Sequence, residues 1–295
     1  MLVSLKEIME YAKKENNAVG AFNCCNYESV AAVVGAAEEL EIPVIISYAE
    51  VHRDIISISD MAPIMLHFAR KAKVPVCVHF DHGVSLESCV EAMKEGFTSV
   101  MIDASAKSYE ENVKITEQVV KLAHNMGITV EAELGHIFTS EMGMGEKKTY
   151  DEIESVENYS DVNDVYTNPM VAKDFVEKTG VDVLAIAFGT SHGVYIKKPV
   201  LDLDRISLIK EKIDIPFVMH GGSGLTEQEY KTAIKNGVKK INYYTYMTLA
   251  GGKAVKEALD KKGPEENVFF HDIPLIATKA MKENVKEAMK IFSLK

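Results

Sequence analysis

The chain has 295 residues, of which 47% are hydrophobic, and its formal net charge is −11. A chain of this length can bury one large core, so the composition does not require a second domain. The acidic balance excludes a protein whose principal ligand is nucleic acid, because binding to phosphate backbones needs clustered Lys and Arg.

The N-terminus and the cysteines both predict a cytoplasmic protein. Residues 1–7 lack the apolar run of a secretory signal, and no apolar stretch approaches the roughly 18 residues of a membrane span. The cysteines form no C-x-x-C pair, so buried reduced thiols are favoured over disulfides or a zinc finger. These residues are Cys24, Cys25, Cys77 and Cys89.

Short runs rich in β-branched residues alternate along the chain with longer segments of helical pattern. This alternation is typical of βα units that close a parallel sheet. The runs are residues 18–22, 43–47, 76–80, 99–102, 129–133, 183–187, 216–220 and 240–243. Eight such units favour a TIM (β/α)8 barrel over an open sheet, and we predict a single TIM-barrel domain over residues 1–295.

Local signals in the intervening segments agree with helices. Ser108 and Glu111 have the spacing of a capping box, and Pro169 suits a first helical turn. Gly127 and Gly180 suit helix ends, where a left-handed backbone is common.

Two segments depart from this alternation. Residues 135–166 form a long polar stretch, and loops of that length in a compact domain are usually functional lids or disordered. Residues 267–272 separate two helical patterns, and residues 274–292 predict a C-terminal helical tail. The sequence leaves open whether this tail packs on the barrel or reaches a partner subunit.

Three predicted strands deliver a histidine beside glycine where the strand ends: His82, His192 and His220. Side chains at the carboxyl ends of barrel strands converge on one face, so we expect these imidazoles to meet. Three neutral imidazoles with a fourth position open form a catalytic zinc arrangement, in which the metal acts as a Lewis acid on a carbonyl. Each histidine alone is more often a hydrogen-bonded core or loop residue, and only their joint placement favours a metal.

The remaining histidines are interpreted as structural. His79 lies two residues before Asp81 and should point to the same side of its strand, which suits a supporting role behind the ligands. The others are His52, His67, His124, His136 and His271.

Glycine-rich turns beside these histidines predict a phosphate site. Gly193 and Gly221 lie where backbone N–H groups can approach an anion closely, and Ser223 follows in the same turn. Asn242 and Thr245, at the end of the last strand, would add an amide and a hydroxyl, and the loops after strands seven and eight of TIM barrels often bind phosphate. The alternative is a set of plain turns, which need glycine in any case.

Six motifs occur in one family's order and spacing. They are His-Phe-Asp-His-Gly at 79–83, Asp-Ala-Ser at 103–105, Glu-Ala-Glu-Leu-Gly at 131–135, Gly-Thr-Ser-His-Gly at 189–193, His-Gly-Gly-Ser-Gly at 220–224 and Lys-Ile-Asn at 240–242. With them the chain resembles the class II, metal-dependent ketose-bisphosphate aldolases over nearly its whole length. The resemblance implies a TIM barrel, a homodimer or homotetramer, a zinc ion that cobalt can replace, and a monovalent cation.

The resemblance also implies residue roles. It makes His82, His192 and His220 the metal ligands and Asp81 the acid/base on the hydroxyl whose C–C bond breaks. Asn242 resembles the residue that hydrogen-bonds the enediolate of dihydroxyacetone phosphate, and Glu141 resembles the loop acid that completes proton transfer there. The alternative for Glu141 is an ordinary solvated loop acid.

Two further acids, Asp103 and Glu133, resemble residues near the family's second, buried metal position. They equally suit partners that orient the ligand histidines through hydrogen bonds. The sequence leaves these two roles open.

The chain departs from the family pattern where the second phosphate of a bisphosphate would bind. Ala49 replaces the usual serine, and no arginine follows Arg205. An aldolase that handles dihydroxyacetone phosphate but prefers an acceptor other than glyceraldehyde phosphate is therefore the hypothesis. Arg53 could supply a replacement cation and restore the bisphosphate interpretation, so fructose, tagatose and related ketose phosphates remain open.

The residues disfavour three other functions. A catalytically silent sugar-phosphate-binding paralogue is disfavoured because Asp81 and the three ligand histidines are present. A metal-dependent hydrolase commonly needs His-x-His on the first strand, which here reads Ala-Phe-Asn-Cys-Cys at 21–25. A Schiff-base lysine mechanism is disfavoured because Lys239 and Lys240 begin the last strand, at the end of the barrel away from the site.

Overall fold

Eight parallel strands close into a barrel in the computed structural model, which describes residues 1–139, 165–195, 199–263 and 265–295. The strands are β2 (Val19–Asn23), β3 (Val44–Ala49), β4 (Val76–Gly83), β5 (Ser99–Ile102), β6 (Thr129–Leu134), β8 (Val183–Ile186), β10 (Phe217–Met219) and β11 (Val238–Tyr243). Their order around the barrel is β4-β3-β2-β11-β10-β8-β6-β5, and a β4–β5 pairing closes it. Each predicted run forms a strand, and the predicted TIM barrel is confirmed.

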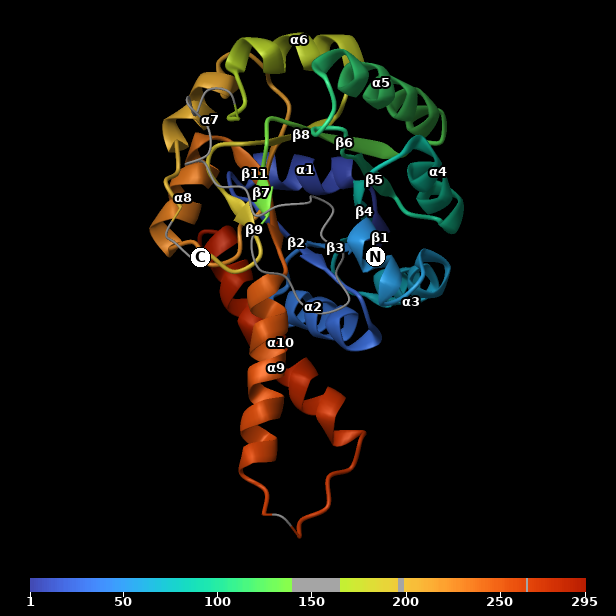
Figure 1. Ribbon diagram of the computed structural model, residues 1–295, viewed down its shortest axis with the longest axis vertical. Helices are drawn as coiled ribbons and strands as arrows, with labels where there is room; N and C mark the ends of the chain where they lie inside the picture. Colours follow the sequence, from blue (N-terminus) through green and yellow to red (C-terminus); the bar gives the residue numbers. More distant parts are fainter. Residues whose placement is uncertain (140–164, 196–198, 264) are drawn as a thin grey trace.

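Helices surround the barrel and cover the outer face of the strands (Figure 1). They are α2 (Tyr27–Leu40), α3 (Ile58–Lys71), α4 (Leu86–Glu95), α5 (Tyr109–Asn125), α6 (Pro169–Thr179), α7 (Leu203–Lys210) and α8 (Glu227–Asn236), with a 3-10 turn η1 at Glu50–Asp54. The predicted capping box of Ser108 and Glu111 begins α5, and Pro169 begins α6. Gly180 ends α6 with a φ of 67°, as its sequence position predicts.

The amino-terminal end of the barrel is closed by α1 (Leu5–Lys14), which follows β1 (Leu2–Val3). Leu5, Ile8 and Met9 on α1 are buried among apolar side chains of the barrel strands, including Ala21 and Ile45. Because this end is filled by side chains, the carboxyl ends of the strands form the face of the barrel where a ligand can enter.

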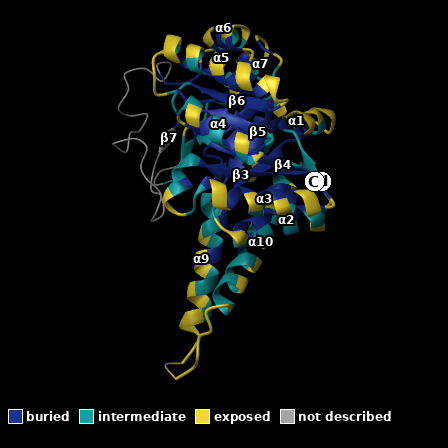
Figure 2. Ribbon diagram, turned by 90° about the vertical axis from the view of Figure 1, so that its right-hand side faces the viewer, coloured by how far each residue is buried: buried dark blue, intermediate teal, exposed yellow. Residues whose placement is uncertain are grey.

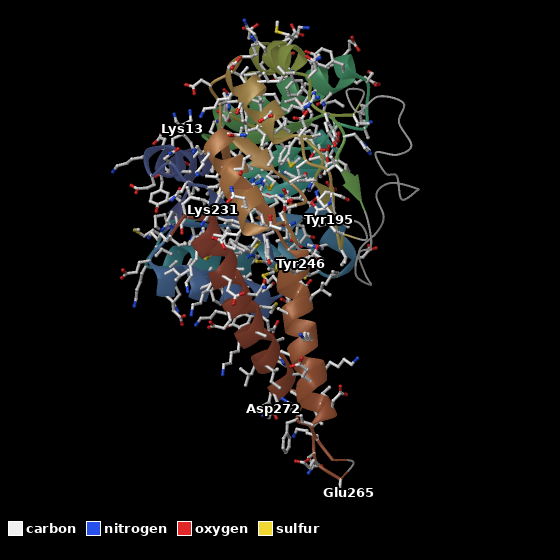
Figure 3. The ribbon with its side chains drawn as sticks, turned by 90° about the vertical axis from the view of Figure 1, so that its left-hand side faces the viewer. Lys13, Tyr195, Lys231, Tyr246, Glu265 and Asp272 are labelled. Carbon is white, nitrogen blue, oxygen red and sulfur yellow. The ribbon has the colours of Figure 1, made fainter. Side chains whose placement is uncertain are left out.

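The last two helices form a hairpin. α9 (Thr245–Asp260) leaves the barrel and α10 (Asp272–Phe292) returns along it, and Phe292 packs edge-on against Tyr230 and Tyr243. α10 covers the residues of the predicted C-terminal helical tail, and its final turns join the core. The outer half of the hairpin extends away from the barrel and is mostly exposed or half-buried (Figures 1 and 2), with Glu265 at its far end (Figure 3).

The predicted long segment after β6 is described only at its two ends. β7 (Phe138–Thr139) pairs in parallel with β9 (Ser191–His192), and Thr139 is the register partner of His192. Glu141 lies outside the described residues. None of the helices in the described parts of the chain is both long and apolar enough to span a bilayer.

A β-bulge distorts β4 where it reaches the barrel mouth. The register with β5 shifts between Phe80 and Gly83, so three steps along β4 match two along β5. His82 lies in the bulge with a φ of 53°, a left-handed backbone that non-glycine residues rarely adopt. The bulge lets the consecutive residues Asp81 and His82 both serve the mouth, where a regular strand would point them to opposite faces.

Gly83 should be required for this bulge. A Cβ there would lie 2.6 Å from the Phe80 ring and 2.8 Å from the Met101 carbonyl oxygen. We expect Gly83→Ala to lower the free energy of unfolding by about 1–3 kcal/mol through overpacking. The control is Gly252→Ala, since a Cβ at that helical position meets nothing within 4 Å and should stabilise the protein slightly. Denaturant unfolding of both variants measures this, and equal stabilities would contradict it.

Candidate metal centre and active site

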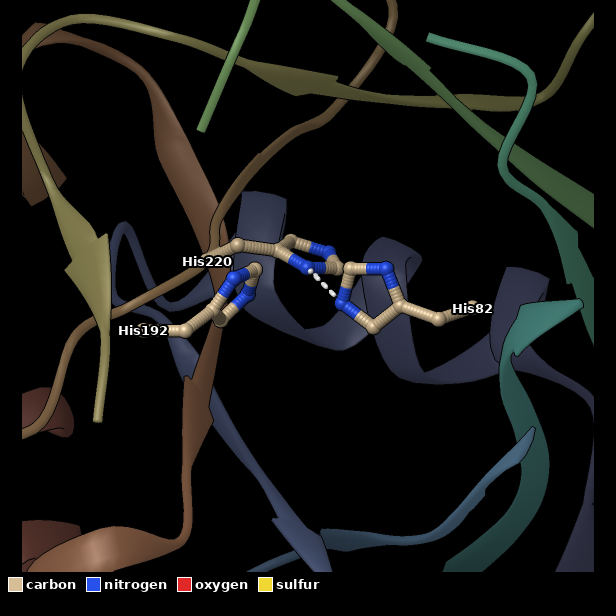
Figure 4. Close-up of side chains that lie close together, drawn as sticks. All are labelled: His82, His192 and His220. Carbon is tan, nitrogen blue, oxygen red and sulfur yellow. Dashed lines mark hydrogen bonds between the residues drawn. The ribbon is translucent and has the colours of Figure 1, made fainter. Parts of the chain in front are cut away.

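Three histidines meet at the barrel mouth (Figure 4). The ring centroid of His82 lies 5.0 Å from that of His192 and 4.5 Å from that of His220. One nitrogen from each of the three rings lies within 4.8 Å of the others. β4 carries His82, β9 carries His192, and His220 directly follows β10, so the predicted convergence of the three strand ends is present in the structure.

Carboxylates behind two of these rings fix how the rings present their nitrogens. Asp103 Oδ2 lies 2.8 Å from Nδ1 of His82, and Glu131 Oε1 lies 2.8 Å from Nε2 of His220. A carboxylate favours a proton on the nitrogen that it contacts, which leaves the opposite nitrogen with its lone pair. Those opposite nitrogens, Nε2 of His82 and Nδ1 of His220, face each other at 2.8 Å.

Two lone pairs at that separation need a positive charge between or beside them. A proton satisfies the pair, and so does a metal ion bound by the imidazoles. Three histidine nitrogens, two of them backed by carboxylates, are a donor set that suits divalent zinc and leaves a coordination position open. The residues therefore fit the metal that the sequence predicts.

The surrounding carboxylates hold positive charge at His82. Burial disfavours the imidazolium, but the charges of Asp81 and Asp103 outweigh it and raise the pKa of His82 to about 10. Burial and then the positive charge of His82 lower the pKa values of His192 and His220. The carboxylates around the three histidines therefore favour positive charge at this place.

Asp81 is held ionised beside the histidines. Burial opposes its charge, but the positive charge of His82 and a hydrogen bond from His79 keep the pKa of Asp81 well below its usual range. The side-chain amides of Asn23 and Asn242 each donate to its carboxylate, at 2.9 Å and 3.1 Å. An ionised, oriented carboxylate at the mouth is suited to accept a proton from a bound hydroxyl.

The two asparagines also present buried acceptors. Oδ1 of Asn23 and Oδ1 of Asn242 are buried, and neither has a hydrogen-bond partner among the residues that the structure describes. A buried acceptor without a partner is costly, so hydroxyl groups of a bound polyol would satisfy both atoms. The sequence motifs included Asn242 but missed Asn23, which no spacing signal marks.

A buried ion pair lies inside the barrel beneath the histidines. Nζ of Lys240 contacts Oε2 of Glu131 at 2.8 Å and Nε2 of His79 at 3.4 Å, and all three side chains are fully buried. Lys240 lies near the start of the last strand, as predicted, but its ammonium group is not remote from the site, because it contacts Glu131, whose other oxygen contacts His220. Glu131 and Lys240 were not predicted as site residues, although a charge inside an apolar strand is a usable signal.

Asp103 and Glu133, whose roles the sequence leaves open, differ in how they contact the histidines. Asp103 contacts His82, which agrees with an orienting partner, whereas Glu133 lies 3.9 Å from Nδ1 of His220. Burial and the charge of Asp103 raise the pKa of Glu133 well above its usual range. His82, Asp103 and Glu133 still hold one donor atom each within 4.8 Å, so a second metal position there stays a prediction.

Four of the five predicted phosphate-binding residues lie in the turns after β9 and β10 and at the start of α9, whereas Asn242 lies at the centre of the mouth and contacts Asp81. Gly221 has a φ of 61° and lies so close to Ser191 that a Cβ would be 2.5 Å from its carbonyl oxygen. The Ser223 hydroxyl accepts from the backbone N–H of Tyr244 at 3.1 Å. Thr245 is the first residue of α9, whose N-terminus has no side-chain cap, so its N–H groups remain suited to an anion. Gly193 has a φ of 87° beside His192 and adds a further turn at this side of the mouth.

Comparison with known proteins identifies relatives along the whole chain. A family model described as fructose-bisphosphate aldolase class-II matches residues 3–295. The chain is 38% identical over 292 residues to the uncharacterized protein YdjI of Escherichia coli strain K12, covering 99% of this chain and 98% of that protein. It is 38% identical over 315 residues to fructose-bisphosphate aldolase of Thermus caldophilus, with 99% and 98% covered. The crystal structure of the YdjI aldolase has a TM-score of 0.83 at 36% identity, over 99% of this chain and 97% of that one.

Glu131 should set metal affinity without touching the metal. We expect Glu131→Gln to weaken zinc binding about 10-fold to 100-fold, because the amide no longer enforces the proton on Nε2 of His220. Competition with a chromophoric chelator measures the dissociation constant. Glu117→Gln removes an exposed carboxylate from α5 and is the control.

The same substitution leaves Lys240 buried without its carboxylate, which should lower the melting temperature. Glu131→Gln/Lys240→Met removes both charges and should recover stability while zinc binding remains weak. Wild-type zinc affinity in either Glu131 variant would show that the carboxylate does not orient His220.

Proposed function

Because the chain belongs to the class II fructose-bisphosphate aldolase family, which consists of carbon–carbon lyases, we propose that it cleaves a ketose phosphate to dihydroxyacetone phosphate and an aldehyde, reversibly. The candidate substrates are fructose 1,6-bisphosphate, tagatose 1,6-bisphosphate and related ketose 1-phosphates. The observation that carries the proposal is the convergence of His82, His192 and His220 beside the oriented carboxylate of Asp81.

The metal of this family would be held by the three histidines, and we propose zinc, with cobalt as a substitute. Bound there, it supplies a Lewis acid that polarises the substrate carbonyl. A monovalent cation near the phosphate is a further proposal from the family resemblance. In the same way Asp103 and Glu133 are proposed to mark a second metal position.

Asp81 performs the proton transfer in this proposal. In the cleavage direction its carboxylate removes the proton from the hydroxyl on the carbon that becomes the aldehyde, and the C–C bond breaks. Asn23 and Asn242 hold the carboxylate in place through their amide N–H groups. Their buried oxygens accept hydrogen bonds from the substrate, with Asn242 oriented toward the enediolate oxygens.

The phosphate of dihydroxyacetone phosphate is assigned to the turns with Gly193, Gly221 and Ser223 and to the N-terminus of α9 at Thr245. The uncapped N–H groups of α9 and the positive φ values of the two glycines support this assignment. Asn242 on β11 is proposed as a further ligand of this phosphate.

Glu141 is proposed as the acid that completes proton transfer at the enediolate carbon. The support comes from the neighbouring strand pair: Glu141 follows Thr139 by two residues, and Thr139 is the register partner of His192. The described chain therefore reaches the proposed metal ligands at Thr139, two positions before Glu141 in the sequence.

Chelation provides the primary test of function. We expect a coupled assay to detect release of dihydroxyacetone phosphate from at least one ketose phosphate. This activity should be lost after chelation and restored by added zinc.

Asp81→Asn should lower kcat by about 100-fold to 10,000-fold while zinc binding persists, because only the proton acceptor is lost. Asp204→Asn, at an exposed position of α7, is the control. No release by zinc-loaded protein would favour a silent sugar-phosphate-binding barrel.

We also propose a cytoplasmic homodimer or homotetramer. The described cysteines are all free thiols, which suits a reducing compartment. The outer part of the α9–α10 hairpin exposes Phe269 by 57%, Phe270 by 82% and Leu275 by 66%. Two helices projecting alone bury too little apolar surface to be stable in water, so a second copy that covers these side chains would stabilise the hairpin.

Negative charges on the outer part of the α9–α10 hairpin should weaken the proposed association between copies of the chain. We expect Phe270→Asp/Leu275→Asp to reduce the molar mass in solution to that of a smaller assembly, measured by light scattering after size-exclusion chromatography. Met170→Asp, which charges an equally exposed apolar residue on α6, should leave the mass unchanged. A wild-type monomer, or an unchanged mass in the double variant, would contradict the proposal.

A further inference from the structure

An ion-pair cluster lies beside the Asp81 end of the barrel mouth. The Arg53 guanidinium contacts Glu50 Oε1 at 3.2 Å and Glu91 Oε2 at 2.8 Å. The other Glu50 oxygen accepts a hydrogen bond from the backbone N–H of Val84 at 2.8 Å. Arg53, the cation that the sequence offered as a second phosphate ligand, is thus held by two carboxylates.

The strand order places this cluster across the barrel from the phosphate turns. β4 and β10 are separated by three strands in either direction around the barrel, so they lie opposite each other. Glu50 directly follows Ala49, the register partner of Asp81, and Val84 lies two residues beyond His82. A ketose whose phosphate lies by the β10 turns therefore extends past the histidines toward Asp81 and this cluster.

Among the residues that the structure describes, the neighbouring wall of the mouth is formed by Cys25 and Tyr244, with the buried ring of His52 against Tyr244. The Cys25 sulfur lies 3.7 Å from the Tyr244 hydroxyl, and the His52 and Tyr244 rings lie 4.9 Å apart. Cys25 follows β2, His52 lies on η1 and Tyr244 follows β11, so the wall joins the cluster to the asparagines that hold Asp81. Cys25 and Tyr244 are half-buried, so their thiol and phenol can contact hydroxyl groups and carbon atoms of a sugar chain, whereas the His52 ring is buried behind this surface.

The charges of the cluster disfavour a second phosphate. One guanidinium and two carboxylates sum to a net charge of −1. A phosphate dianion approaching this side would meet that charge, and it could gain Arg53 only by displacing a carboxylate from it. An unphosphorylated polyol end meets no such repulsion from the cluster, because it carries no charge.

We propose that the acceptor half of the substrate carries no phosphate, so that the chain cleaves ketose 1-phosphates to dihydroxyacetone phosphate and an unphosphorylated hydroxyaldehyde. Arg53, Glu50 and Glu91 are the residues that determine this preference. The inference rests on the proposed function and narrows its substrate class. Glu50 and Glu91 act on selectivity through charge and take no part in the bond-breaking step.

The test compares kcat/KM of the zinc-loaded protein for paired substrates: fructose 1-phosphate with fructose 1,6-bisphosphate, and tagatose 1-phosphate with tagatose 1,6-bisphosphate. We expect the 1-phosphate to equal or exceed the bisphosphate in every pair that is cleaved. A higher value for either bisphosphate overturns this inference and leaves the proposed function intact. No cleavage of any ketose phosphate overturns both.

A charge variant tests the mechanism of selection. Glu50→Gln/Glu91→Gln keeps the side-chain shapes and changes the cluster from −1 to +1, since two negative charges are removed and Arg53 is retained. We expect the ratio of kcat/KM for bisphosphate over 1-phosphate to rise about fivefold to tenfold at low ionic strength and to fall back as salt is added. Glu87→Gln, exposed one turn earlier on α4, should leave the ratio unchanged. An unchanged ratio in the double variant would show that the cluster does not select the substrate.

Discussion

The buried ion pair between Glu131 and Lys240 is the interaction on which the site depends. Burial alone would neutralise the Glu131 carboxyl group, but the Lys240 ammonium, with His220 and His79, keeps its pKa below the usual value. Only as a carboxylate can Glu131 hold a proton on Nε2 of His220 and so turn the lone pair of Nδ1 toward the other ligands. The barrel interior thus contributes to metal chemistry through charge, although none of its side chains needs to touch the metal.

The mouth of the barrel is organised around a local distortion. A left-handed residue such as His82 carries a strain of about 1–3 kcal/mol, which the surrounding strands must hold in place. The bulge that contains it brings an acid and an imidazole from adjacent positions to one side of the strand. Asp103 then fixes the ring of His82, and Asn23 and Asn242 fix the carboxylate of Asp81. Each reactive group is held by a neighbour from a different strand, which is how a rigid barrel positions chemistry.

The two sides of the mouth divide recognition between them. Turns with positive φ and an uncapped helix lie on the β10 and β11 side, where backbone N–H groups suit an anion of fixed shape. The β3 and β4 side instead holds an arginine already paired with two acids, next to the Cys25 thiol that follows β2. The proposed metal ligands therefore lie at the centre, while the rim proposed to meet the variable half of a substrate can change without disturbing them.

The strands of the barrel, the helix caps and the meeting of the three histidines could all be predicted from local sequence patterns. These follow from local patterns: β-branched runs, capping residues and glycine at strand ends are legible over a few residues, and parallel closure brings the strand ends together. Only the tertiary structure decided the roles of Asn23, Glu131 and Lys240 and the capture of Arg53 by two acids. Glu131 and Lys240 are 109 positions apart, and Asn23 and Asp81 are 58 apart. No local pattern encodes which buried charges will meet, because that depends on strand order and on how far each side chain reaches into the barrel.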